Sequence, residues 1–151
     1  KGPNRYRRGL YTYFWRATPH PFLTVFDAPN GVQACTRRMR SNTPLQALTL
    51  LNDQAGVESA QALARRVLAE TSRDASTEDR IKHAFVLCLG RAPSDNEART
   101  LEQLITVDHS KTLEPAVGDS RPIETAEPER ASAWFDLARV LLNLDEFMTR
   151  E

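Results

Sequence analysis

The fold is decided by residues 76–90, STEDRIKHAFVLCLG. Ser76 is a residue type that caps helix N-termini, and the acidic residues after it favour the positive end of the helix dipole. Apolar side chains then recur at helical spacing and share one face: Ile81, Ala84, Phe85 and Cys88. Gly90 provides the left-handed residue at which helices commonly end. The stretch therefore predicts a capped helix with a buried face.

The same signals recur on both sides of this helix. Cap residues followed by apolar residues at helical spacing predict helices that begin near Thr43, Asp53, Ser94 and Glu127, and a short terminal helix after Asn143. Prolines, a glycine and few apolar residues predict a loop over 109–128. We therefore expect a mainly α fold, an irregular bundle of four to five helices that forms a single domain over residues 44–151.

Residues 1–43 are expected to form an extended aromatic and basic arm that precedes the bundle. Seven of the eleven aromatic residues of the chain fall in its first 30 positions. Residues 8–16 are rich in aromatics and lack a helical period, which predicts a short strand. Two prolines then interrupt regular structure, residues 22–27 favour one helical turn, and residues 29–31 predict a turn.

Charge divides the chain at the same place. Residues 1–43 carry eight basic side chains against Asp27 alone, a formal charge of +7. The whole chain holds 20 basic and 20 acidic residues, so the remainder carries 12 basic and 19 acidic residues and a charge of −7. Two interpretations stay open: the arm lies on the bundle or on a neighbouring domain, or it is a strip that binds polyanions.

The arginine-rich segment before Pro44 is the strongest candidate site. A helix N-terminus already favours anions through its free N–H groups and its dipole, and arginines next to it would add charge-assisted hydrogen bonds. The alternative is that these arginines pair with Asp27 or Asp53, or with backbone carbonyls, and hold the arm in place. The candidate anion-binding or docking residues are Arg37, Arg38, Arg40, Asn42 and Thr43.

Motifs for chemistry are missing from the sequence. It contains no nucleophile elbow, zinc-binding helix, glycine-rich phosphate loop or paired-cysteine motif. His20, His83 and His109 are scattered, and none has a second ligand at helical spacing on a clear face. We therefore assign no catalytic residue, no metal ligand and no cofactor-binding residue, and whether the protein is an enzyme stays undecided at this level.

Two further classes of partner are not expected. The basic and aromatic residues of the segment 7–16 have the composition of a single-strand nucleic-acid site, but the acidic remainder would repel a long phosphate backbone, so we expect no nucleic-acid partner. No apolar run approaches the roughly 18 residues of a membrane-spanning helix.

The two cysteines, Cys35 and Cys88, leave two alternatives open. They are far apart in the sequence and form no CxxC motif. One disulfide between them, which an exported protein would allow, and two buried free thiols are both consistent with the sequence.

Three blocks resemble the C-terminal part of a planctomycete family, domain of unknown function 1553. The first block is residues 8–21, RGLYTYFWRATPHP, with 24–30, TVFDAPN. The second is CTRR at 35–38, SNTPLQAL at 41–48 and LLND at 50–53, and the third is LLNLDEF at 141–147. The blocks span nearly the whole chain in the family's order.

The resemblance implies a setting for the chain but no activity. Members of the family are typically long exported proteins, often with an N-terminal cytochrome c-like domain, so the chain is expected to be a fragment of such a protein in the periplasm or cell envelope. The resemblance favours a disulfide between Cys35 and Cys88. Any haem would belong elsewhere in the parent protein, because no haem-attachment motif is present here.

We therefore expect a non-catalytic helical module of a multidomain exported bacterial protein that docks on neighbouring domains through its arm. The alternative is an accessory domain that binds an anion, or an acidic or sulfated polysaccharide, in an envelope enzyme or a cytochrome-linked electron-transfer protein.

Overall fold

A computed structural model describes residues 6–15, 17–37, 41–106 and 128–149, of which 128–130 are described by their backbone. The chain divides into two units, Lys1–Gln46 and Ala47–Glu151. The division falls inside the helix Pro44–Asn52, whereas the sequence predicted it at the start of that helix.

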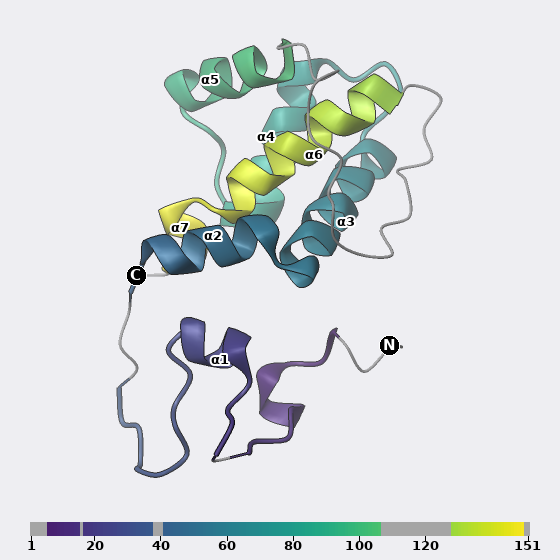
Figure 1. Ribbon diagram of the computed structural model, residues 1–151. Coiled ribbons are helices and arrows are strands. Elements are labelled where there is room, and N and C mark those ends of the chain that lie inside the picture. The colour runs from purple at the N-terminus through teal and green to yellow at the C-terminus, as the bar shows by residue number, and fades with distance from the viewer. Residues whose placement is uncertain (1–5, 16, 38–40, 107–127, 150–151) are drawn as a thin grey trace. The chain divides into compact units, whose positions relative to one another are not determined.

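Every regular element in the described residues of the larger unit is a helix (Figure 1). Their bounds are α2 (Pro44–Asn52), α3 (Gln54–Glu70), α4 (Thr77–Leu89), α5 (Asp95–Thr106), α6 (Pro128–Leu142) and α7 (Asp145–Met148). This confirms the predicted mainly α, irregular bundle. The break after Asn52, the start near Pro128 and the short terminal helix are also where the sequence placed them.

The helix ends follow the local signals of the sequence. Asp53 and Ser76 cap α3 and α4 by accepting hydrogen bonds from backbone N–H groups two and three residues later. Gly90 ends α4 in the left-handed region, with φ of 75°. At the start of α5 the Ser94 N–H donates to the Glu97 carboxylate at 2.7 Å, and the Glu97 N–H donates to the Ser94 hydroxyl at 3.4 Å. The predicted capping box is therefore confirmed.

The core lies where α3, α4 and α6 meet. Among the described residues the most extensive contact between two helices is that of α3 with α6, and α6 also contacts α4 and α5. Figure 1 shows α6 running across α4 and beside α3. The largest fully buried side chains come from these three helices: Val67, Ile81, Phe85, Leu137 and Leu141. Burial of these side chains is the main source of stability for this unit.

The turn from α2 to α3 requires glycine at position 56. A Cβ atom on Gly56 would lie 2.1 Å from the carbonyl oxygen of Leu50, which is backbone and cannot swing aside. The same turn is held from the far end of the sequence, because Nη2 of Arg139 on α6 donates to the carbonyl oxygen of Leu51 at 3.0 Å. That carbonyl belongs to the last turn of α2, where helices leave acceptors unsatisfied.

Arg91 forms an ionic clamp after α4. Its guanidinium contacts the Glu97 carboxylate of α5 at 2.8 Å and the Glu146 carboxylate of α7 at 2.6 Å, and it lies over the Phe85 ring at 5.2 Å. The Arg91 guanidinium, followed by hydrogen bonds from Ser94, lowers the pKa of Glu97 to about 2. The clamp thus joins three helices at the edge of the core.

The smaller unit contains short helical segments. They are the 3₁₀ turn η2 (Gly9–Tyr11) and helix α1 (Pro21–Val25), so the helical turn predicted over 22–27 is confirmed. The strand predicted over residues 8–16 is wrong: the described part of this segment contains η2 and no strand. A strand needs a second extended segment to take its backbone hydrogen bonds, and the described residues of this unit supply none.

Candidate functional site

The turn after α1 begins the candidate site. Proline at the first position of α1 costs no hydrogen bond, and the rings of Phe22 and Phe26 pack with their centroids 4.6 Å apart. Asp27 follows in the left-handed region, with φ of 52°, a conformation that Asp tolerates better than most residues. The N–H of Ala28 then donates to the carbonyl oxygen of Leu23 at 2.9 Å and closes the turn.

A second turn, at residues 30–32, contacts Phe14 of the aromatic segment 8–16. The Asn30 side-chain oxygen accepts a hydrogen bond from the Val32 N–H at 3.1 Å, which closes an Asx turn around Gly31. Gly31 has φ of 69°, and a Cβ atom there would lie 3.0 Å from the Phe14 ring. The Phe14 ring therefore packs against Gly31, where a side chain would crowd the ring and the positive φ favours glycine.

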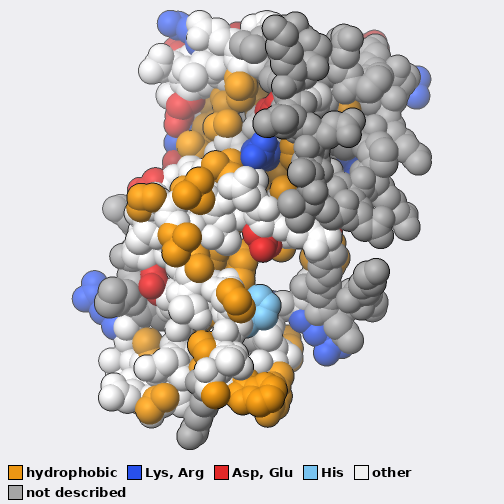
Figure 2. Space-filling model, in the orientation of Figure 1, with side chains coloured by type: hydrophobic (Ala, Val, Ile, Leu, Met, Phe, Trp, Pro, Cys, Tyr) orange, Lys and Arg blue, Asp and Glu red, His pale blue; other side chains and the backbone are white. Residues whose placement is uncertain are grey.

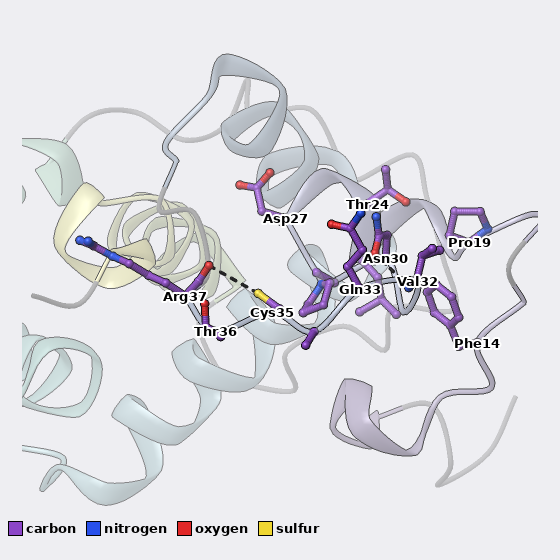
Figure 3. A pocket seen from close by; sticks show the side chains of 14 residues that line it. Phe14, Pro19, Thr24, Asp27, Asn30, Val32, Gln33, Cys35, Thr36 and Arg37 are labelled. Atoms are coloured by element: carbon purple, nitrogen blue, oxygen red, sulfur yellow. Dashed lines mark hydrogen bonds between the residues drawn. The ribbon is translucent and has the colours of Figure 1, made fainter.

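These turns enclose an open pocket of about 610 Å³, lined by residues between Phe14 and Arg37 (Figure 3). Its apolar lining includes Phe14, Pro19, Leu23 and Val32, and its polar lining includes Thr24, Asn30, Gln33 and Thr36. The titratable groups of the lining are Asp27, Cys35 and Arg37. Apolar surface with a few polar groups suits binding, and the lining holds no pair of an acid with a base that could transfer protons.

Gln46 connects the start of α2 with the turn after α1. The Thr43 N–H donates to Oε1 of Gln46 at 2.9 Å, and the Gln46 N–H donates to the Thr43 hydroxyl at 3.3 Å, a reciprocal capping box. The Nε2 group of Gln46 donates to the Val25 carbonyl at 2.9 Å, to the Ser41 hydroxyl at 2.8 Å and to the Asp27 carboxylate at 3.2 Å. The Ser41 hydroxyl also donates to Asp27.

We call this arrangement the Gln46 clasp; its members are Val25, Asp27, Ser41, Thr43 and Gln46. The Gln46 residue is only 3% exposed, so its side-chain amide needs these partners. The clasp satisfies the one acidic side chain of residues 1–43 and fixes the turn that forms one side of the pocket.

Large apolar side chains of the smaller unit face solvent, and one of them, Val32, also lines the pocket. Six of them, which we call the exposed apolar set, are between 64% and 84% exposed: Tyr6, Leu10, Tyr11, Tyr13, Trp15 and Val32. Figure 2 shows hydrophobic side chains spread over the visible face of the smaller unit. This is a high density of exposed apolar groups for one short segment, and such surfaces mark interaction sites.

The structure places only part of the predicted anion site. Arg37 is exposed, and so are Asn42 and Thr43, while Arg38 and Arg40 lie outside the described residues. Two of the backbone donors expected at the helix N-terminus are not available, because Pro44 has no N–H and the Gln46 N–H is taken by Thr43. Anion binding at this segment stays a prediction.

The two carboxylates considered as arginine partners have other contacts. Asp27 accepts hydrogen bonds from Ser41 and Gln46, and Asp53 accepts one from the Ala55 N–H at 2.8 Å. Gln46 itself was missed as a site residue. The spacing of Thr43 and Gln46, a threonine followed three positions later by glutamine, is a capping-box signal that could have identified it.

Both cysteines are free thiols in this structure. Cys35 is exposed and its thiol donates to the Arg37 carbonyl at 3.5 Å. Cys88 is half-buried, and burial raises the pKa of its thiol to about 11. The two residues lie in different units, and a disulfide between them stays a prediction.

Other reactive groups do not gather into a site in the described part of the chain. His83 pairs with Glu70 at 2.9 Å on the surface of α3 and α4, and Arg66 also contacts Glu70 at 2.7 Å. Within the described ranges, no three His, Cys, Asp or Glu side chains lie close enough to hold a metal ion. None of the described helices is long and apolar enough to cross a membrane.

Comparison with known proteins identifies one family. The family model described as "Protein of unknown function (DUF1553)" matches residues 1–105. No curated protein and no solved structure matches the chain. The match covers all of the candidate site.

Proposed function

Because the chain belongs to the DUF1553 family, for which no function is described, we propose that it is a non-catalytic docking module. Residues 6–37 fasten it to a neighbouring domain of a longer exported bacterial protein, in the periplasm or cell envelope. The helical unit is the larger part of the module that this docking surface fastens.

One observation carries this proposal: the exposed apolar set of the smaller unit. Each of its side chains keeps most of its apolar area in water, and burial releases roughly 25 cal/mol per Å² of that area. The set contains Tyr13 and Trp15, and Arg37 lies in the same unit. Tyrosine, tryptophan and arginine are the residue types that dominate the binding energy of protein interfaces.

The chemistry of the set favours a protein surface over a polysaccharide. Leu10 and Val32 are among its most exposed members, and aliphatic side chains gain little from a hydroxylated sugar chain. The loss of donors at the start of α2, where Pro44 and Gln46 stand, also removes part of the anion site on which glycan binding would depend.

The proposal is tested with the whole chain and the purified remainder of its parent polypeptide. Isothermal titration calorimetry is expected to show saturable binding, which Trp15→Ser or Tyr13→Ser weakens at least about tenfold. The matched control is Val86→Ser, which removes a half-exposed apolar side chain from α4 and leaves affinity unchanged. Absence of binding by a folded, monodisperse chain would overturn the proposal, and so would equal losses in all three variants.

A further inference from the structure

The pocket lined by residues between Phe14 and Arg37 indicates what kind of partner the docking surface would bind. We propose that it binds an acidic peptide segment, with an apolar side chain of the peptide anchored in the pocket and its carboxylates meeting Arg37 at the edge of the lining. This inference rests on the proposed function, because the peptide would be the part of the neighbouring domain that the docking surface recognises.

The size and lining of the pocket fit an apolar anchor. Its volume of about 610 Å³ lies within the range of roughly 300–1,000 Å³ that is usual for ligand sites. Phe14, Leu23 and Val32 supply apolar surface that a large side chain would remove from water. A phosphate or sugar chain would leave this surface uncovered, so these contacts favour a peptide.

The pocket is formed before any ligand arrives. The Phe14 ring rests on Gly31, and prolines at 19 and 29 restrict the backbone on two sides of the lining. The Gln46 clasp fixes the turn at Asp27. A pocket that needs little ordering loses little affinity to conformational entropy when it binds.

The charge around the pocket favours carboxylates. Asp27 is the acidic residue of the lining, and its carboxylate accepts hydrogen bonds from Ser41 and Gln46. The Arg37 side chain points away from Phe14, Pro19 and Val32 (Figure 3), and Arg37 is exposed. The described basic side chains of this unit are Arg7, Arg8 and Arg37, against Asp27 as its one described acidic side chain. An acidic peptide would therefore place its anchor inside and its carboxylates outside, at the rim.

Polar side chains of the lining can hold the backbone of such a peptide. The Asn30 oxygen is used by the Val32 N–H, which leaves the Asn30 amide N–H groups to donate to a peptide carbonyl. Gln33 and Thr36 offer both donors and acceptors at the same site. These contacts would orient an extended segment without demanding one sequence.

The test uses the whole chain and the blocked peptide acetyl-Glu-Glu-Phe-Glu-Glu-amide as the probe. In a nuclear magnetic resonance titration we expect saturable shifts of backbone amide signals from residues 30–37. A peptide with Ala in place of Phe is expected to bind about tenfold or more weakly, because it lacks the anchor. A peptide with Lys in place of every Glu is expected not to bind.

Val32 offers a matched pair of variants at the rim of the pocket. Its side chain is 69% exposed, so neither a glutamate nor a lysine there disturbs packing. Both variants lose the apolar contact of Val32 and differ in the charge they bring to the peptide, so Val32→Glu is expected to bind the acidic peptide at least about tenfold more weakly than Val32→Lys. Circular dichroism confirms that both variants keep the helical content of the parent chain.

The possible results separate this inference from the proposed function. No saturable shift at millimolar peptide, or equal peptide binding by the two Val32 variants, overturns the inference. If Val32→Glu binds the parent polypeptide as tightly as the unchanged chain does, the inference is overturned and the docking function stands. Peptide binding without docking of the parent polypeptide keeps the inference and overturns the docking function. A sulfated oligosaccharide that shifts the same signals, when the peptide does not, overturns it in favour of a glycan.

Discussion

Replacing Gln46 with glutamate tests whether the Gln46 clasp holds the smaller unit together. Glutamate has nearly the same shape and can still accept the hydrogen bond from Thr43, so the capping box survives. It cannot donate, so the contacts to the Val25 carbonyl and the Ser41 hydroxyl are lost. It also places a second carboxylate against Asp27, to which Nε2 now donates at 3.2 Å.

The expected loss follows from these contacts. The two hydrogens of the Gln46 amide make two full hydrogen bonds, each worth about 1 kcal/mol net, and the repulsion from Asp27 adds to this. The free energy of opening the turn at residues 25–28 should therefore fall by at least about 2 kcal/mol, which corresponds to amide hydrogen exchange about 30 times faster. The N–H groups of Phe26 and Ala28, which are bonded within this turn, report the change.

The control is Gln103→Glu, the same substitution at an exposed position of α5. Surface changes of this kind stay within about 0.5 kcal/mol, so exchange at Phe26 and Ala28 should not change. If Gln46→Glu leaves exchange at these two amides within about threefold of the parent chain, the clasp does not hold the turn and the reasoning fails.

Three further predictions concern the helical unit. Gly56→Ala should destabilise the chain by about 1–3 kcal/mol in urea unfolding, although alanine favours helices, because its Cβ collides with the Leu50 carbonyl. Leu137→Ala should cost about 2–5 kcal/mol in the same assay, because the side chain is 1% exposed in the core. The pKa of Glu97, lowered from 4.5 to about 2 by Arg91, means that the clamp stabilises fully above pH 4.5 and loses this effect as the pH falls towards 2. Carboxyl resonances followed in a titration measure that pKa.

Each of these predictions has its own control. Ala62→Gly, at an exposed position of α3, measures how much stability alanine gives this helix relative to glycine. If Gly56→Ala raises the free energy of unfolding, as helix preference alone would, there is no collision with the Leu50 carbonyl. Val140→Ala truncates a partly exposed side chain of α6. If it lowers the free energy of unfolding as much as Leu137→Ala does, the placement of the core is contradicted. Arg91→Ala should return the pKa of Glu97 towards 4.5, and a pKa that stays near 2 would show that Arg91 is not the main cause.

The helices could be predicted because their signals are local. A capping residue, an apolar face and a terminating glycine stand within a few turns of one another, as Ser76, Phe85 and Gly90 do, and each acts through the backbone next to it. The same was true of the capping box at Ser94. Local rules failed in the aromatic segment 8–16, where β propensity was present but the described residues offer no partner strand.

The candidate site, like the turn from α2 to α3, was harder to predict because its contacts are long-range. Gln46 reaches Val25 across 21 positions, and Arg139 reaches Leu51 across 88. Contacts between residues so far apart in the sequence produce no periodic pattern from which they could be predicted. The density of aromatic residues before position 30 drew attention to the segment that contains Phe14, but it gave no sign of the pocket that the turns at Asp27 and Gly31 create.

The position of α6 has a practical consequence for handling this protein. The family match ends at residue 105, yet Trp134, Leu137 and Leu141, which complete the core, come from α6 beyond that point. A recombinant chain cut at the family boundary would leave the inner faces of α3 and α4 bare to solvent and prone to aggregation. Anyone expressing the module should therefore choose its end by the last packed helix and disregard where sequence similarity stops.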